Sequence, residues 1–281
     1  MTGDNEFGEP GQVLWTPSPE RIESSKLTAF ARRIEAAHGE RFEDYESLWR
    51  WSVEHLEEFW AEVWDFFDVA PGTSYDAVLA DRSMPGAVWF PGARLNYAEH
   101  VLRRGEGRGG ETALVSVSED GTVSEVTWAE LTEQVGAVAT ALRRMGVQPG
   151  ERVVGYLPNI PQAVVAFLAA ASVGAVWSAC GPEIGLQSAV DRFAQLEPVL
   201  LIACDGYRFG GRTHDRRDRS GVEVSERLDD HRVRHLEPAA AHRLFEELPV
   251  LGPADDVDPR AEQLDAELLE RARGGDLHRE V

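Results

Sequence analysis

The middle third of the chain alternates short apolar runs with segments of helical periodicity, and this alternation constrains the fold more than any other feature. Apolar runs of strand length occur at Arg152–Leu157, Ala175–Ala179 and Val199–Cys204. Segments with a helical spacing of apolar residues separate them, at Gln162–Val173 and Leu186–Leu196. Strands that alternate with helices in this way form a parallel sheet with helices on both faces. The sequence therefore predicts an α/β fold.

A β-hairpin and a capped helix come before this alternation. Thr112–Val117 and Thr122–Val126 flank Asp120-Gly121, a dipeptide typical of tight hairpin turns. Thr127 lies three residues before Glu130, which is the spacing of a capping box at a helix N-terminus. The helix that follows has one apolar face, formed by Trp128, Leu131, Val135, Val138, Leu142 and Met145.

Residues 1–100 are rich in aromatic side chains and hold six of the eight tryptophans. One stretch has the spacing of a helix with an apolar face, formed by Leu56, Phe59, Trp60, Val63, Trp64 and Phe67. This pattern predicts a helix docked on a larger body, and an aromatic cage for a ligand is the alternative. The segment from Pro71 to Pro91 is rich in Pro and Gly and is expected to be irregular.

Residues 213–281 lack the alternating pattern. They contain one aromatic residue, Phe245, and no apolar run of buried-strand type. Arg243–Leu248 and Ala261–Ala272 are the stretches with helical potential. We therefore expect this polar tail to be non-homologous or disordered and to add no strand to the sheet. The predicted organisation is a helical cap at 1–100, a sheet region at 101–212 and a tail at 213–281.

The charge balance excludes several classes of function. Asp and Glu total 49 against 28 Lys and Arg, a formal charge of −21, which disfavours nucleic-acid binding. No apolar run approaches the roughly 18 residues of a membrane helix, and the first residues lack the pattern of a signal peptide. With two cysteines, no disulfide framework is expected and a cytoplasmic location is predicted. Arginine replaces lysine almost everywhere, since Lys26 is the only lysine, and this acidic composition is typical of a high-salt proteome.

Common catalytic and metal motifs are absent from the sequence. His231 and His235 have the i, i+4 spacing of metal ligands, but Arg232 stands where a zinc protease has its glutamate. A solvated surface is therefore expected there, and no metal site is predicted. A Walker-type loop needs a lysine after a glycine-rich turn, which Lys26 does not provide. No G-x-S-x-G elbow is present either, and no catalytic residue is predicted.

One short motif follows the strand Val199–Cys204. Arg208 and Arg212 flank Gly210-Gly211 at the carboxyl end of a predicted parallel strand, where α/β sheets bind ligands. Glycines let backbone amides approach a ligand, and each guanidinium can bind a phosphate in a bidentate manner. A charged turn without a ligand is the alternative explanation of the same residues.

Four segments resemble one family of enzymes. Leu14–Ile22 (LWTPSPERI) and Met84–Glu99 (MPGAVWFPGARLNYAE) resemble the acetoacetyl-CoA synthetases of the acyl-adenylate-forming ligase superfamily. Tyr45–Trp64 resembles the N-terminal cap shared with acetyl-CoA synthetases, and Val126–Leu131 (VTWAEL) resembles the first core motif of the superfamily. The resemblance runs from about Leu14 to Arg212, and it implies the first part of an adenylate-forming ligase behind a helical cap.

The resemblance implies a reaction and a set of substrates. Enzymes of this family use ATP and magnesium to convert a carboxylate, here acetoacetate, to an acyl-adenylate, and then transfer the acyl group to CoA. An arginine–glycine turn in the position of Arg208–Arg212 contacts the nucleotide end of CoA in related acetyl-CoA synthetases. The resemblance therefore implies CoA contacts for Arg208, Gly210, Gly211 and Arg212. The turn in this chain is one residue longer than the corresponding turn of the acetyl-CoA synthetases. Ala179–Glu183 also departs from the family pattern.

The sequence does not contain the catalytic motifs of the family. The lysine-containing phosphate loop, the adenine- and ribose-binding segments and the C-terminal domain with its catalytic lysine have no counterpart here. We therefore expect a fragment of a lipid-metabolism ligase that is inactive alone, from either a frameshifted gene or a truncated paralogue. Two alternatives are a non-catalytic interaction or regulatory module, which could pair with a complementary ligase fragment, and a fragment of an acetyl- or propionyl-CoA synthetase.

Overall fold

The computed structural model describes residues 13–69, 74–204, 206–215 and 234–236, and the chain divides into two compact units. The first unit ends at Leu95 and the second begins at Asn96. This division lies near residue 100, where the composition changes, but the three predicted domain ranges stay a prediction. In the described residues, no helix combines the length and the apolar character that a membrane crossing requires.

The first unit contains four helices in its described residues: α1 (Pro19–Glu23), α2 (Lys26–His38), α3 (Tyr45–Glu54) and α4 (Leu56–Phe66). The helices α1, α2 and α3 each begin after an N-cap residue. The side chains of Ser18, Ser25 and Asp44 accept a hydrogen bond from an N–H group of the first turn of α1, α2 and α3, respectively. The residue that ends α2, Gly39, has a φ of 72°, a left-handed conformation that glycine adopts without strain.

The predicted helix at 56–67 is confirmed as α4, but its apolar face is shared between two neighbours. Phe59, Val63 and Phe66 pack against a core of buried side chains on α2 and α3: Phe30, Ile34, Leu48 and Trp51. Trp60 and Trp64 instead meet aromatic rings beyond residue 70, at Trp89, Phe90 and Tyr75. The apolar face of α4 thus packs against other elements of the first unit.

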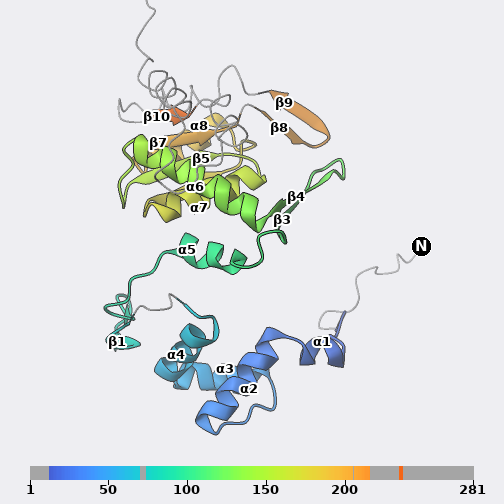
Figure 1. Cartoon of the computed structure of the whole chain (residues 1–281), viewed down its shortest axis with the longest axis vertical. Coiled ribbons are helices and arrows are strands. Elements are labelled where there is room, and N and C mark those ends of the chain that lie inside the picture. Colours follow the sequence, from blue (N-terminus) through green and yellow to red (C-terminus); the bar gives the residue numbers. More distant parts are fainter. Residues whose placement is uncertain (1–12, 70–73, 205, 216–233, 237–281) are drawn as a thin grey trace, which may run out of the picture. The chain divides into compact units, whose positions relative to one another are not determined.

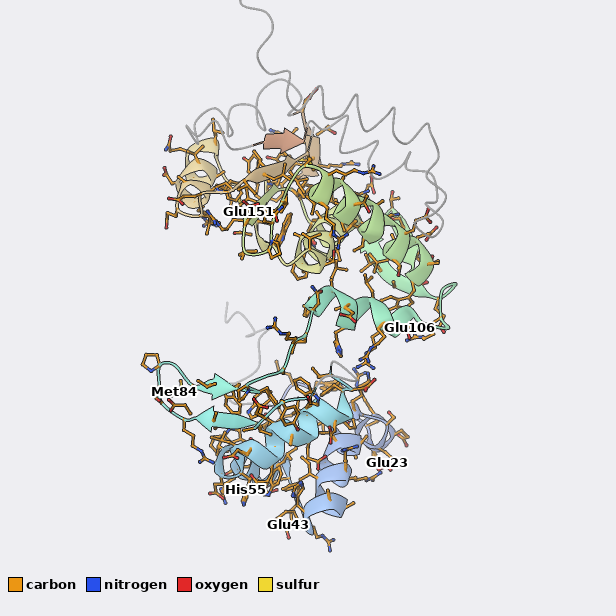
Figure 2. The ribbon with its side chains drawn as sticks, turned by 60° about the vertical axis from the view of Figure 1, so that its left-hand side comes forward. Glu23, Glu43, His55, Met84, Glu106 and Glu151 are labelled. Atoms are coloured by element: carbon orange, nitrogen blue, oxygen red, sulfur yellow. The ribbon has the colours of Figure 1, made fainter. Side chains whose placement is uncertain are left out.

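The segment from Pro71 to Pro91 is less irregular than the sequence predicts. Two short strands, β1 (Leu79–Asp81) and β2 (Val88–Trp89), pair antiparallel. Figure 2 shows Met84 at the tip of the loop that joins them. The rest of the described segment is irregular, as expected. The sequence does not predict the strand pair because strands of two or three residues have no detectable periodicity, and packing against the aromatic face of α4 holds them in place.

The second unit is built on a parallel sheet. It begins with α5 (Tyr97–Leu102) and η1 (Arg103–Gly105), and the hairpin β3 (Thr112–Val117) and β4 (Val123–Thr127) follows. The remaining elements are α6 (Trp128–Arg144), β5 (Arg152–Tyr156), α7 (Pro161–Ser172), β6 (Val176–Cys180), α8 (Leu186–Ala194), β7 (Leu200–Ala203), β8 (Gly206–Phe209), β9 (Arg212–Asp215) and β10 (Arg234–Leu236). The predicted capping box of α6 is present, with Thr127 and Glu130 bonded to each other's backbone N–H groups.

Helices cover both faces of this sheet, as predicted. The chain passes from β5 through α7 to β6, and then returns through α8 to β7 on the other side of β5. Because both crossovers are expected to be right-handed, this reversal of direction places α7 and α8 on opposite faces (Figure 1). Val153 packs in one core with α6 and α7, whereas the next residue, Val154, packs in the other with α8. The α/β fold class is therefore confirmed.

The tail contributes a strand that the sequence does not predict. The four parallel strands follow the order β10-β7-β5-β6, and β10 pairs with β7 through Arg234, His235 and Leu236. The expectation that residues 213–281 add no strand to the sheet is thus wrong. An edge strand is held by backbone hydrogen bonds on one side, so three residues can form it without an apolar run.

Candidate functional site

The candidate motif at Arg208–Arg212 forms the end of a β-hairpin. β8 and β9 pair antiparallel, and Phe209 faces Arg212 across the last rung. Gly210 and Gly211 make the two-residue turn between them, with φ values of 60° and 72°. Such a turn needs left-handed conformations at both positions, which explains the glycine pair. The hairpin begins three residues after β7 ends, so it lies at the carboxyl end of a parallel strand as predicted.

The register of this hairpin separates the two arginines. Arg208 pairs with Thr213 and Arg212 pairs with Phe209. Directly paired residues share a face of a hairpin and neighbours along a strand alternate, so the two guanidinium groups leave from opposite faces. Tyr207 and His214 form another pair, and their rings stack with centroids 4.8 Å apart. Sequence reasoning placed both arginines around one turn, and the two-residue turn length is the signal that would have separated them.

Two acidic residues of a different hairpin occupy the motif. Glu119 and Asp120 lie in the turn between β3 and β4, whose tip meets the β8–β9 hairpin (Figure 1). The N–H groups of Gly210 and Gly211 donate to the two carboxylate oxygens of Glu119, over 3.0 and 3.1 Å. The Arg208 guanidinium donates to Asp120 Oδ2 over 2.6 Å. The turn therefore binds a carboxylate with its backbone amides, as a site for an anion would.

These contacts shift both carboxyl groups toward the charged form. The amides of Gly211 and Gly210 lower the pKa of Glu119, and the charge of Arg208 adds to this effect. The pKa of Asp120 is lowered first by its hydrogen bonds with Thr122 and then by Arg208. The Arg208–Asp120 pair is half exposed, at 49% and 39% of the side-chain surface, so solvent screens it and its contribution to stability is small.

Sequence reasoning missed Glu119 and Asp120 as members of this site. Asp120 was identified only as a turn residue, and the two hairpins lie about ninety residues apart, at |i−j| values of 88, 91 and 92 for the three contacts. Pairs of carboxylates are common in exposed turns, so no local pattern marks these two. Only the tertiary structure brings them to the glycine pair.

Metal-binding candidates find no support within the described part of the chain. No group of three or more His, Cys, Asp or Glu side chains there is placed to hold a metal ion. Magnesium is the metal that the resemblance implies, and we derive no step through it. Of the two histidines with ligand spacing, His231 lies outside the described residues, as does the side chain of His235.

Comparison with known proteins identifies the family. The sequence model of the AMP-binding enzymes matches residues 101–267, which is more than half of the chain. The chain belongs to the AMP-binding enzyme family. The model of the acetyl-coenzyme A synthetase N-terminus matches residues 45–101, which begin at α3 and include α4 and the β1–β2 pair. The AMP-binding match extends beyond Arg212, where the resemblance was expected to end.

Individual relatives narrow the comparison to one branch of this family. An acetoacetyl-CoA synthetase of Xenopus tropicalis is 42% identical over 207 residues, which are 72% of this chain and 30% of that protein. A malonamoyl-CoA synthetase of Penicillium aethiopicum is 36% identical over 208 residues, 72% of this chain and 28% of that protein. The chain thus spans about three tenths of the length of these relatives.

A solved structure agrees with the sequence comparison. The structure of acetoacetyl-CoA synthetase from Streptomyces lividans matches with a TM-score of 0.76 and 47% identity, over 88% of this chain and 39% of that chain. The resemblance noted in the sequence is therefore confirmed. The chain corresponds to the N-terminal portion of this branch, and its α/β fold is the fold of that portion.

Proposed function

We propose that the chain supplies the N-terminal part of an acetoacetate–CoA ligase, which activates acetoacetate with ATP and transfers the acyl group to CoA. The observation that carries this proposal is that a curated animal relative at 42% identity and a solved bacterial structure at 47% identity are both acetoacetyl-CoA synthetases. Acetoacetate is proposed as the acid because the acetoacetyl-CoA synthetase of Xenopus tropicalis is 42% identical, against 36% for the malonamoyl-CoA synthetase that aligns over the same share of the chain. Such a ligase would work on small molecules in the cytoplasm.

This chain alone does not form an acyl-adenylate in our proposal. Its one lysine is Lys26, near the N-terminus of α2, so no lysine is available for a phosphate loop. Such loops and their cations provide most of the stabilisation in phosphoryl and adenylyl chemistry. Acetoacetate-dependent exchange of pyrophosphate into ATP by the purified chain would refute this element. Exchange that appears only after a complementary ligase fragment is added would support the alternative of a non-catalytic module.

Within the proposed ligase, Arg208, Gly210, Gly211 and Arg212 contact the phosphates at the nucleotide end of CoA. The two glycine amides donate to a carboxylate within the chain, and this contact supports a role for them in binding an anion. The arginines extend from both faces of the same hairpin, so a ligand that reaches both must wrap around its tip. Because the site is exposed, each ion pair is expected to contribute roughly 1 kcal/mol or less, and CoA should bind weakly.

NMR titration of the labelled chain with CoA tests this site. CoA should shift the backbone amides of Val199–Arg212, and CoA without its 3′-phosphate should shift them less. The double variant Arg208→Ala, Arg212→Ala should lose the response. Arg50→Ala with Arg82→Ala is the matched control, because it removes two exposed cations from the first unit. An equal response in the site variant and the unaltered chain would contradict the assignment.

A further inference from the structure

The contact between Glu119 and the glycine turn has a consequence for ligand binding. Two successive N–H groups, on Gly210 and Gly211, donate to the two oxygens of one carboxylate. A phosphate presents the same kind of acceptor, since both groups carry negatively charged oxygens that accept hydrogen bonds. The amides cannot serve both anions at once. An external phosphate can reach them only when the Glu119 carboxylate has left.

Asp120 binds another residue of the Arg208–Arg212 motif, the side chain of Arg208. Its carboxylate accepts a hydrogen bond from the Arg208 guanidinium over 2.6 Å. Three of the four residues proposed to contact CoA are therefore engaged by the β3–β4 turn. Arg212 differs from them, because it makes no ion pair within the described residues.

We infer that the β3–β4 turn is an internal competitor, in which Glu119 occupies the anion position of the Gly210–Gly211 turn and must be displaced before a ligand phosphate binds there. This inference rests on the proposed function, because CoA is the source of that phosphate. The contacts are exposed, so opening them costs little and a ligand can displace them. If the closed form is about tenfold more populated than the open form, the apparent affinity for the phosphate falls about tenfold.

The variant Glu119→Gln separates competition from structural support. Glutamine keeps the size of the side chain but removes the charge and one of the two acceptor oxygens. In the full chain, this variant should bind CoA about three- to tenfold more tightly than the unaltered chain. Glu133→Gln, on an exposed position of α6, removes the same charge elsewhere and should leave the affinity unchanged. Unaltered amide shifts in β5 and β7 verify that each variant is folded.

Two ligands distinguish failure of this inference from failure of the proposed function. Inorganic pyrophosphate tests the anion position without the rest of CoA. If pyrophosphate binds Glu119→Gln more tightly than the unaltered chain but CoA shifts no amide, the competitor stands and the CoA assignment fails. If CoA binds equally well to both chains, the CoA assignment stands and the competitor is refuted. If neither ligand shifts the amides of Gly210 and Gly211 in the variant, the competitor is also refuted.

Discussion

At the scale of single residues, the charge state of Glu119 governs the strength of its contact with Gly210 and Gly211. Its carboxylate accepts hydrogen bonds from the N–H groups of both glycines. The other charged residues nearby are Arg208 and Asp120, which are bonded to each other, and Arg212 on β9. The glycine amides hold the pKa of Glu119 below its ordinary value. The contact is therefore fully present above that ordinary value and is lost as the pH falls through the lower, folded value.

An acid titration followed by NMR checks this expectation. The amide shifts of Gly210 and Gly211 should change with a midpoint below the ordinary pKa of a glutamate, as for other carboxylates that accept backbone hydrogen bonds. The same transition should disappear in Glu119→Gln and persist in Asp120→Asn. A midpoint at or above the ordinary value would show that the contact does not favour the charged carboxylate.

A second prediction at this scale concerns Gly155 in β5. An added Cβ atom would lie 2.6 Å from the indole of Trp177, so Gly155→Ala forces the ring or the strand to move. We expect unfolding to become easier by about 1–3 kcal/mol. Gly136→Ala is the control, because nothing lies near its added Cβ and alanine favours the helix α6 by up to about 1 kcal/mol. Urea unfolding of both variants should therefore give shifts of opposite sign, and equal shifts would contradict the prediction.

At the scale of elements, β10 protects one edge of the parallel sheet. It pairs with β7 over three residues, and β7 is fully buried along its length. Removing β10 leaves a row of unpaired backbone groups on an apolar strand, which is a template for association with another chain. The tail therefore matters for the sheet, contrary to the expectation drawn from its composition.

Two truncated chains test the role of β10. A chain of residues 1–238 keeps this strand, whereas a chain of residues 1–215 loses it. The shorter chain should unfold roughly 2–4 °C lower, corresponding to about 1 kcal/mol for this size, and should self-associate more as its concentration rises. Equal midpoints and equal sedimentation of the two chains would show that β10 contributes nothing to the sheet.

At the scale of the whole molecule, the net charge of −21 makes a long-range electrostatic contribution to the free energy of unfolding. Like charges repel one another across the folded chain, and this repulsion destabilises the compact state. Salt shortens the range of the repulsion, from about 10 Å at 0.1 M to about 3 Å at 1 M. The local ion pairs on the surface weaken as well, but each contributes little.

Thermal unfolding in potassium chloride checks this balance. The midpoint of the full chain should rise between 0.1 and 1 M salt, by roughly 2–4 °C for each kcal/mol of repulsion removed. A variant with several exposed acidic residues changed to Gln or Asn should show a smaller rise. A midpoint that falls with salt would show that the attractive pairs outweigh the repulsion.

The sequence by itself determined the local elements and the family. The alternation from Arg152 to Cys204, the capping box at Thr127 and the aromatic face of α4 are local patterns, and each is present in the structure. Such patterns are readable because hydrophobic periodicity and helix caps act within a few residues. The resemblance to acetoacetyl-CoA synthetases that the comparisons confirm also rests on short segments, Leu14–Ile22, Tyr45–Trp64, Met84–Glu99 and Val126–Leu131.

Only the tertiary structure decided which distant groups meet. The pairing of β10 with β7 and the contact of Glu119 with Gly210 and Gly211 join segments far apart along the chain. The first contact uses backbone hydrogen bonds alone, and every residue except proline carries the same donor and acceptor. The second joins a side-chain carboxylate to two backbone N–H groups, and exposed carboxylates are common, so no local pattern specifies either partner. The sheet formed by β5, β6 and β7 brings these segments together, and their proximity cannot be predicted from local sequence patterns.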